Sequence, residues 1–127
     1  MSRRQPRRSI WPPFLYALQG IRTSVREEAH MRFHLFAAAL VIVMALLLDI
    51  DKNGWLWLIA SIVGVLTSEM FNSAIERAVD LATAERHPVA KAAKDIAAGA
   101  VLVASLGAAA IGLIVLGPPL WHWLAQR

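Results

Sequence analysis

Three long apolar stretches constrain the fold of this chain more than any other feature of its sequence. Residues 96–116 and 54–68 contain no charged side chain, and residues 33–48 are apolar except for His34. A helix needs about 20 predominantly apolar residues to cross the hydrocarbon core of a bilayer. Hydrophobic residues make up 57% of the sequence and the mean hydropathy is +0.52, well above the values of soluble domains. We therefore predict an all-α membrane protein with transmembrane helices at about 33–49, 55–71 and 96–117.

The segment before the first apolar stretch is basic and then amphipathic. Residues 1–9 form a basic tail, and residues 10–127 have the length of a single integral-membrane domain. Between residues 14 and 28, apolar side chains recur at spacings of three and four, opposite glutamine and arginine side chains. This pattern favours a helix that lies on the membrane surface, with its arginines reaching the lipid headgroups. The alternative is an amphipathic helix packed on a soluble core, which the hydropathy of the rest of the chain disfavours.

The distribution of charge predicts the orientation in the membrane. A basic N-terminal segment can bind nucleic acid or anionic lipid, and the apolar stretches that follow favour lipid, so we expect no nucleic-acid partner.

The positive-inside rule places the N-terminal arginines and the loop between residues 77 and 94 in the cytoplasm. The 49–54 turn and the C-terminus then lie on the opposite side, which three spans allow. We expect the last helix to end at Pro118 and Pro119, before Trp121 and Trp123 at the far interface.

Polar side chains recur on one face where the second apolar stretch ends. No glycine or proline interrupts residues 65–85, so one helix should carry the apolar sequence into the polar sequence. At about 100° per residue, a single stripe of that helix contains Glu69, Asn72, Ser73, Glu76 and Asp80. Stacked carboxylates at the end of a membrane helix are costly unless they are paired, hydrated or bound to a cation. Because hard oxygen ligands suit Mg²⁺, the stripe predicts a magnesium site.

The position of the charged clusters favours chemistry at the membrane interface. A transporter more often has an ionisable group in the middle of a span, and none of the three predicted spans has one there. Interfacial carboxylates can hold Mg²⁺ on a nucleotide, a lysine can hold phosphate, and one carboxylate can take a proton from an alcohol. These are the requirements of phosphoryl transfer, although the chain has no Walker A motif and no glycine-rich phosphate loop. The alternative is a non-enzymatic channel or scaffold with an acidic, metal-binding rim.

Several motifs of this chain occur together in one known family. The acidic stretch reads Glu69-x-x-Asn72-Ser73-Ala74-Ile75-Glu76-x-x-Val79-Asp80, and the shorter motifs are Gly20-x-Arg22, Glu28-x-x-x-Arg32, Glu85-x-His87-Pro88 and Lys91-x-x-Lys94-Asp95. Over roughly residues 14–117 the sequence resembles the prokaryotic diacylglycerol kinase family, which includes the undecaprenol kinases. Phe71 departs from the family pattern, which usually has a smaller aliphatic residue there, and it should be tolerated because it faces away from the stripe.

The resemblance implies a kinase of the bacterial cell membrane that transfers phosphate from ATP, with Mg²⁺, to a lipid alcohol. It implies a homotrimer whose active sites are shared between subunits. Glu69 would be the catalytic base, and Glu28 and Glu76 would bind both the metal and the nucleotide. The further nucleotide contacts would be Tyr16, Glu85, His87, Lys94 and Asp95. Asn72 and Asp80 would support this polar cluster, and the lipid substrate would meet Arg22, Arg32 and Glu69. Ser9 stands where the diacylglycerol branch often has an arginine. We therefore do not expect this chain to make the contact that the arginine makes in that branch.

The sequence has features of both branches of the family. The segment Arg32-Phe33-His34-Leu35 is similar to the R-x-H-L motif of undecaprenol kinases, and so is His87-Pro88-x-Ala90-Lys91. The segment Leu48-Asp49-Ile50-Asp51 resembles the diacylglycerol branch. Because the segment after Arg32 should lie nearer to the lipid headgroup, we favour undecaprenol as the substrate and keep diacylglycerol as the alternative. His34 itself is expected at the membrane interface and not on a metal.

Overall fold

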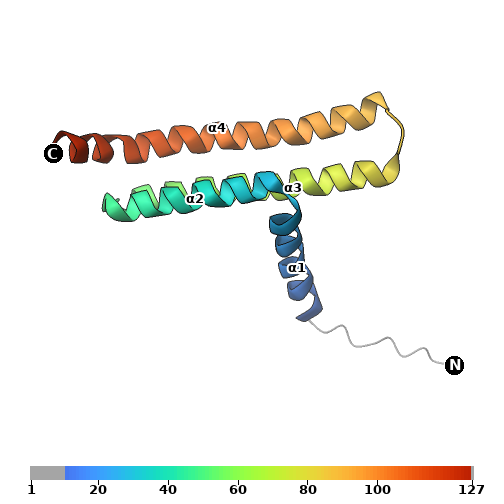
Figure 1. The fold of residues 1–127 in the computed structure, drawn as a ribbon, viewed down its shortest axis with the longest axis horizontal. Helices are drawn as coiled ribbons and strands as arrows, with labels where there is room; N and C mark the ends of the chain where they lie inside the picture. The colour runs from blue at the N-terminus through green and yellow to red at the C-terminus, as the bar shows by residue number, and fades with distance from the viewer. Residues whose placement is uncertain (1–10, 127) are drawn as a thin grey trace.

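Residues 11–126, which the computed structural model describes, form four helices and no strand (Figure 1). The helices are α1 (Trp11–Glu27), α2 (Ala29–Leu47), α3 (Lys52–Ala82) and α4 (Pro88–Ala125). By length and composition, α2, α3 and α4 are able to cross a membrane. The predicted all-α class is therefore confirmed, with three helices that are long and apolar enough to be the predicted membrane spans. Ser9 and the basic 1–9 tail lie outside the described residues.

The chain changes direction sharply between α1 and α2, and α1 leaves the other helices at a steep angle (Figure 1). Glu28 separates the two helices with an extended backbone, at φ −101° and ψ 117°. The last carbonyl groups of a helix have no partner within the helix. Here the Arg32 guanidinium donates hydrogen bonds to two of them, to Val25 O at 3.3 Å and to Arg26 O at 2.9 Å. Arg32 therefore fixes the end of α1 against the start of α2. The predicted segment 14–28 is helical up to Glu27, and its location on a membrane surface stays a prediction.

The second predicted feature, one helix that runs from apolar into polar sequence, is confirmed by α3. It begins after a short turn in which Asp49 has φ 50°. Asp51 caps the helix by accepting a hydrogen bond from Gly54 N at 2.9 Å, as expected for an N-terminal cap. The helix then continues without a break to Ala82, past every residue of the acidic stripe.

The prediction that Pro118 and Pro119 end the last helix is wrong. α4 continues through both prolines to Ala125 and includes Trp121 and Trp123. Each proline removes one amide donor from the hydrogen-bond ladder, but its φ near −65° is itself compatible with a helix. Prolines are tolerated inside membrane helices where the freed carbonyl groups find other partners. Two adjacent prolines followed by apolar sequence are therefore insufficient to stop this helix.

The helices pack most closely where α2, α3 and α4 meet near the α2–α3 turn. The buried cluster consists of Ala45, Leu58 and Leu116, one residue from each of these helices. Along the rest of the bundle, large apolar side chains of α4 such as Val103, Leu113 and Ile114 are exposed. In water such a surface would be unfavourable, whereas lipid can cover it. The exposed apolar surface agrees with the predicted location in a membrane.

Replacing Gly54 with alanine should destabilise this packing. An added Cβ would lie 2.9 Å from Val115 Cγ1 and closer still to Ile50 Cγ2. Both methyl groups belong to branched side chains with little freedom to move, and overpacking of this kind costs about 1–3 kcal/mol. Thermal unfolding in detergent should show a lower midpoint for Gly54→Ala. Gly64→Ala is the control, because a Cβ at Gly64 would meet nothing within 4 Å. Equal midpoints for the two variants would contradict the prediction.

Candidate active site

Glu69 is buried and lies against the neighbouring helix. Its side chain is only 6% exposed, and its Oε1 lies 3.1 Å from Nε2 of His34 on α2. A buried carboxylate is unfavourable without a partner, and here the imidazole of His34 is the close polar partner. The expectation that His34 would simply lie at the interface missed this contact. The segment Arg32 to Leu35 was identified in the sequence by its similarity to the R-x-H-L motif. The periodicity of α2 alone could not show which side chain of α3 this segment faces.

The next turns of α3 keep the predicted polar stripe together. Asn72 Nδ2 donates to Glu76 Oε1 at 3.1 Å, and Ser73 is buried beside them. Asn72 Oδ1 is also buried, and within the described residues it has no hydrogen-bond partner. A buried acceptor without a donor favours the approach of a cation or a ligand donor. The amide of Asn72 and the carboxylate of Glu76 thus lie in contact on one face of α3, and both groups carry oxygen atoms of the hard kind that Mg²⁺ prefers.

Glu28, the other predicted metal ligand, is joined to α3 by Arg77. The Arg77 Nη2 atom donates to Glu28 Oε1 and to Glu27 Oε2, both at 2.9 Å. The hydrogen bond to Glu28, followed by that to Glu27, raises the pKa of Arg77, so its positive charge is present at every physiological pH. Arg77 was not singled out from the sequence, because an arginine three residues before Asp80 has no distinguishing pattern. It places Glu28 next to the helix that carries Glu76.

No group of three or more His, Asp or Glu side chains in the described part of the chain is arranged to hold a metal by itself. This arrangement still fits Mg²⁺ that arrives with a nucleotide, because protein sites of that kind use one or two carboxylates together with substrate phosphates. Glu28 and Glu76 would provide the carboxylates, with the unpartnered Asn72 Oδ1 nearby.

A polar cavity of about 700 Å³ lies where α3 ends and α4 begins. The predicted residues that line it are Asp80, Glu85, His87, Lys94 and Asp95. Lys94 Nζ donates to Asp80 Oδ1 at 2.5 Å, and Lys91 pairs with Asp95. His87 begins α4, since its Nδ1 accepts from Val89 N at 3.2 Å. The structure thus brings together four of the five residues that were predicted as further nucleotide contacts. The cavity is within the size range of small-molecule sites.

The remaining predicted residues do not join this cavity within one chain. Tyr16 lies on α1 with 66% of its surface exposed, and Arg22 is exposed on the same helix. Neither Arg22 nor Arg32 contacts Glu69 among the described residues, since Arg32 binds the end of α1. Along α3, Glu69 and Asp80 are eleven residues apart, which corresponds to about 16 Å at 1.5 Å per residue. A single chain therefore presents the site in separate parts.

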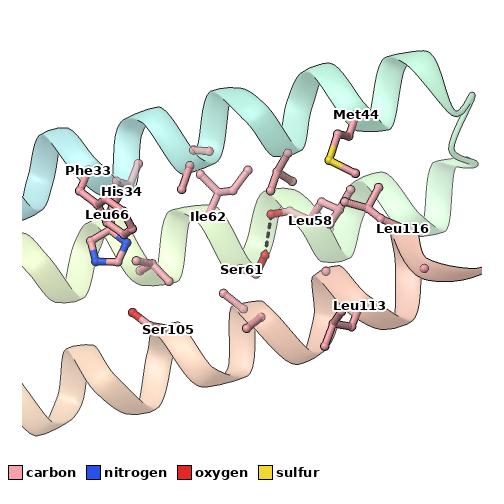
Figure 2. Close-up of a pocket in the computed structure, with 18 of the residues that line it drawn as sticks. Phe33, His34, Met44, Leu58, Ser61, Ile62, Leu66, Ser105, Leu113 and Leu116 are labelled. Carbon is pink, nitrogen blue, oxygen red and sulfur yellow. Dashed lines mark hydrogen bonds between the residues drawn. The ribbon is translucent and has the colours of Figure 1, made fainter. Parts of the chain in front are cut away.

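A second cavity, which is apolar, lies between α2, α3 and α4. Its volume is about 600 Å³, and small side chains of α4 such as Ala108, Ala109 and Gly112 form much of one wall. Figure 2 shows Phe33, His34 and Leu66 together toward one end, and Met44, Leu58 and Leu116 toward the other. The cavity therefore leads from the apolar core to the histidine that holds Glu69. The sequence did not predict it.

A membrane-spanning helical protein with carboxylates beside both an apolar and a polar cavity belongs to the class of interfacial membrane enzymes. Comparison with known families makes the assignment specific. The family description "Prokaryotic diacylglycerol kinase" matches residues 15–116, and the chain belongs to this family. The predicted resemblance is confirmed over nearly the range expected.

Three relatives illustrate the similarity. The chain is 40% identical over 107 residues to the undecaprenol kinase of Bacillus subtilis, covering 84% of this chain and 87% of the relative. It is 37% identical over 101 residues to the diacylglycerol kinase of Escherichia coli, covering 80% and 83%. It is 38% identical over 89 residues to the diacylglycerol kinase of Pseudomonas aeruginosa, covering 70% and 72%. Both branches that the sequence motifs indicated are therefore represented.

Proposed function

We propose that this chain is an integral membrane kinase that transfers the γ-phosphate of ATP to undecaprenol, giving undecaprenyl phosphate. The observation that carries the proposal is the position of Glu69. It is a buried carboxylate held by His34, and His34 lines the apolar cavity. A lipid alcohol whose chain lies in that cavity would bring its hydroxyl group to the carboxylate. The identity to the Bacillus subtilis undecaprenol kinase and the residues Arg32 to Leu35 favour undecaprenol as the alcohol.

In this proposal each part of the site has one task. Glu69 accepts the proton of the lipid alcohol as the alcohol oxygen attacks the γ-phosphorus. Glu28 and Glu76 hold Mg²⁺, which neutralises charge on the ATP phosphates when it is bound. The polar cavity with Lys94, His87, Glu85 and Asp95 binds the nucleotide, and Asp80 orients Lys94 through their ion pair.

We further propose a homotrimer in which neighbouring subunits complete each site. The separation of the parts within one chain supports this arrangement, because Tyr16 and Arg22 are exposed on α1, outside the lining of either cavity. A second copy could bring its own α1 toward the cavities. The extensive exposed apolar surface of α4 leaves room for contacts with other copies as well as with lipid.

The test is ATP turnover by the purified protein in mixed micelles that contain undecaprenol, diacylglycerol or neither lipid. The proposal expects ATP- and Mg²⁺-dependent phosphorylation of undecaprenol at a higher kcat/KM than that of diacylglycerol. Diacylglycerol is the second candidate, favoured by residues 48–51 and by the named relatives, and the reverse preference would establish it. If the protein turns over ATP with neither lipid, the kinase proposal fails and the alternative is a non-enzymatic channel or scaffold.

We place the N-terminus and the site in the cytoplasm of a bacterial cell, with the chain crossing the inner membrane more than once. This orientation can be tested by cysteine labelling, because the sequence has no cysteine of its own. Asn53 and Ala84 lie at opposite ends of α3, near its start and just beyond its end, and both are exposed. A reagent that cannot cross the membrane should label Asn53→Cys from outside the cell and leave Ala84→Cys unlabelled. The reverse pattern would invert the proposed topology.

A further inference from the structure

The contact between His34 and Glu69 joins two helices and is largely buried. His34 comes from α2 and Glu69 from α3, and their side chains are 18% and 6% exposed. In the described part of the chain, His34 is the polar side chain that lies against Glu69, with Nε2 3.1 Å from Oε1. The nearest basic residue on α2, Arg32, is engaged with the carbonyl groups of α1. The imidazole is thus well placed to determine the orientation of the Glu69 carboxylate.

The geometry leaves part of the carboxylate available for substrate. A carboxylate has two oxygen atoms that accept about four hydrogen bonds between them. His34 Nε2 lies against Oε1, so Oε2 keeps its capacity to accept a proton from an alcohol. Restricting a glutamate side chain before substrate binds removes rotamer freedom that would otherwise be lost in the reaction. The close contact with His34 would therefore prepare Glu69 for use as a base.

The same histidine faces the apolar cavity. Figure 2 shows His34 close to Phe33 and Leu66, with Ser105 of α4 on the other side of the space. Ser105 Oγ is buried and has no hydrogen-bond partner within the described residues. This end of the cavity thus combines an imidazole and a free hydroxyl group in otherwise apolar surroundings. A polar end on an apolar cavity is suited to a long-chain alcohol.

We propose that His34 is a positioning residue that holds Glu69 through Oε1, so that Oε2 accepts the proton of an alcohol entering from the apolar cavity. The inference rests on the proposed function, in which Glu69 is the base. Loss of a partner that orients a catalytic or ligating group typically lowers activity by about 10–100-fold. His34→Leu, which removes the donor but keeps an apolar volume, should lower kcat by that factor. KM for ATP should stay near the parental value, because the polar cavity is untouched.

Two further substitutions at His34 test the contact with Glu69 itself. His34→Gln places an amide nitrogen about as far along the side chain as Nε2, so it should restore most of the lost kcat. His34→Asn places its amide nitrogen near the position of Nδ1, and it should resemble the leucine variant. His30→Leu is the matched control, because His30 lies one turn earlier on α2 and is exposed. Thermal unfolding in detergent shows which variants are folded. If the leucine variant is unfolded, the asparagine variant is used in its place to measure the loss of kcat.

A double-mutant cycle with Glu69→Gln then separates positioning from a general structural effect. If His34 acts through Glu69, His34→Leu should lower kcat little further once Glu69 is replaced by glutamine. The inference is overturned if the leucine variant keeps the parental kcat, if glutamine restores no more than asparagine, or if the two losses multiply. Failure of the proposed function gives a different result, since the parent protein would then phosphorylate neither lipid.

Discussion

Glu69→Gln should lower kcat by about 10²–10⁴-fold while leaving ATP binding close to that of the parent, because this is the usual effect of losing a general base. A lipid alcohol is a poor nucleophile at neutral pH, and a positioned carboxylate assists removal of its proton. Glutamine keeps the size of the side chain and can still place its carbonyl oxygen against His34, so the packing around the site should survive. The measurement is steady-state kinetics with lipid and with ATP, each varied in turn.

The control for this prediction is Glu27→Gln. Glu27 is the glutamate that carries no role in the proposed site, and its side chain is largely exposed in its pair with Arg77. Exposed ion pairs contribute little to stability, so this variant should keep nearly parental kinetics. A loss confined to KM for ATP in the Glu69 variant, with kcat unchanged, would show that Glu69 binds nucleotide and is not the base.

Glu76→Gln and Glu28→Gln should each weaken the binding of Mg²⁺·ATP, by about 10–100-fold if they behave as groups that tune a metal site. Each substitution removes an anionic oxygen from a proposed metal ligand without changing the size of the side chain. A glutamine at position 76 would still accept the hydrogen bond of Asn72, and a glutamine at position 28 could still accept from Arg77. The expected defect is therefore in the affinity for the metal nucleotide, measured by titration with Mg²⁺·ATP.

Glu27→Gln is again the matched control, since it stands next to Glu28 and contacts the same arginine. Parental binding by both the Glu28 and the Glu76 variants would contradict the metal assignment. Mixing the inactive Glu69→Gln and Glu76→Gln proteins before assembly tests the shared site. Recovered activity would support sites made of two subunits, and no recovery would favour sites made of one chain.

The intrahelical part of the candidate site could be predicted from the sequence because helical geometry is local. Residues three, four and seven apart lie on one face whatever surrounds the helix. Glu69, Asn72 and Glu76 were placed on one stripe from spacing alone, and the bond from Asn72 to Glu76 agrees with it. The gathering of Glu85, His87 and Lys94 was implied by the family resemblance, and their closeness in sequence around one turn supports it.

The sequence by itself determined the fold class, the three helices that are able to span a membrane and the continuous α3, because long apolar stretches in lipid favour a backbone whose hydrogen bonds are satisfied within a helix. Only the tertiary structure decided that His34 meets Glu69, that Arg77 joins Glu28 to α3, and that an apolar cavity lies between α2, α3 and α4. These contacts depend on how each helix is rotated about its axis and at what angle neighbouring helices cross. Many side chains along each helix together determine these rotations and crossing angles, so they cannot be predicted from any single motif. Pro118 and Pro119 illustrate the converse case, in which a local preference to end a helix was overridden and α4 continued to Ala125.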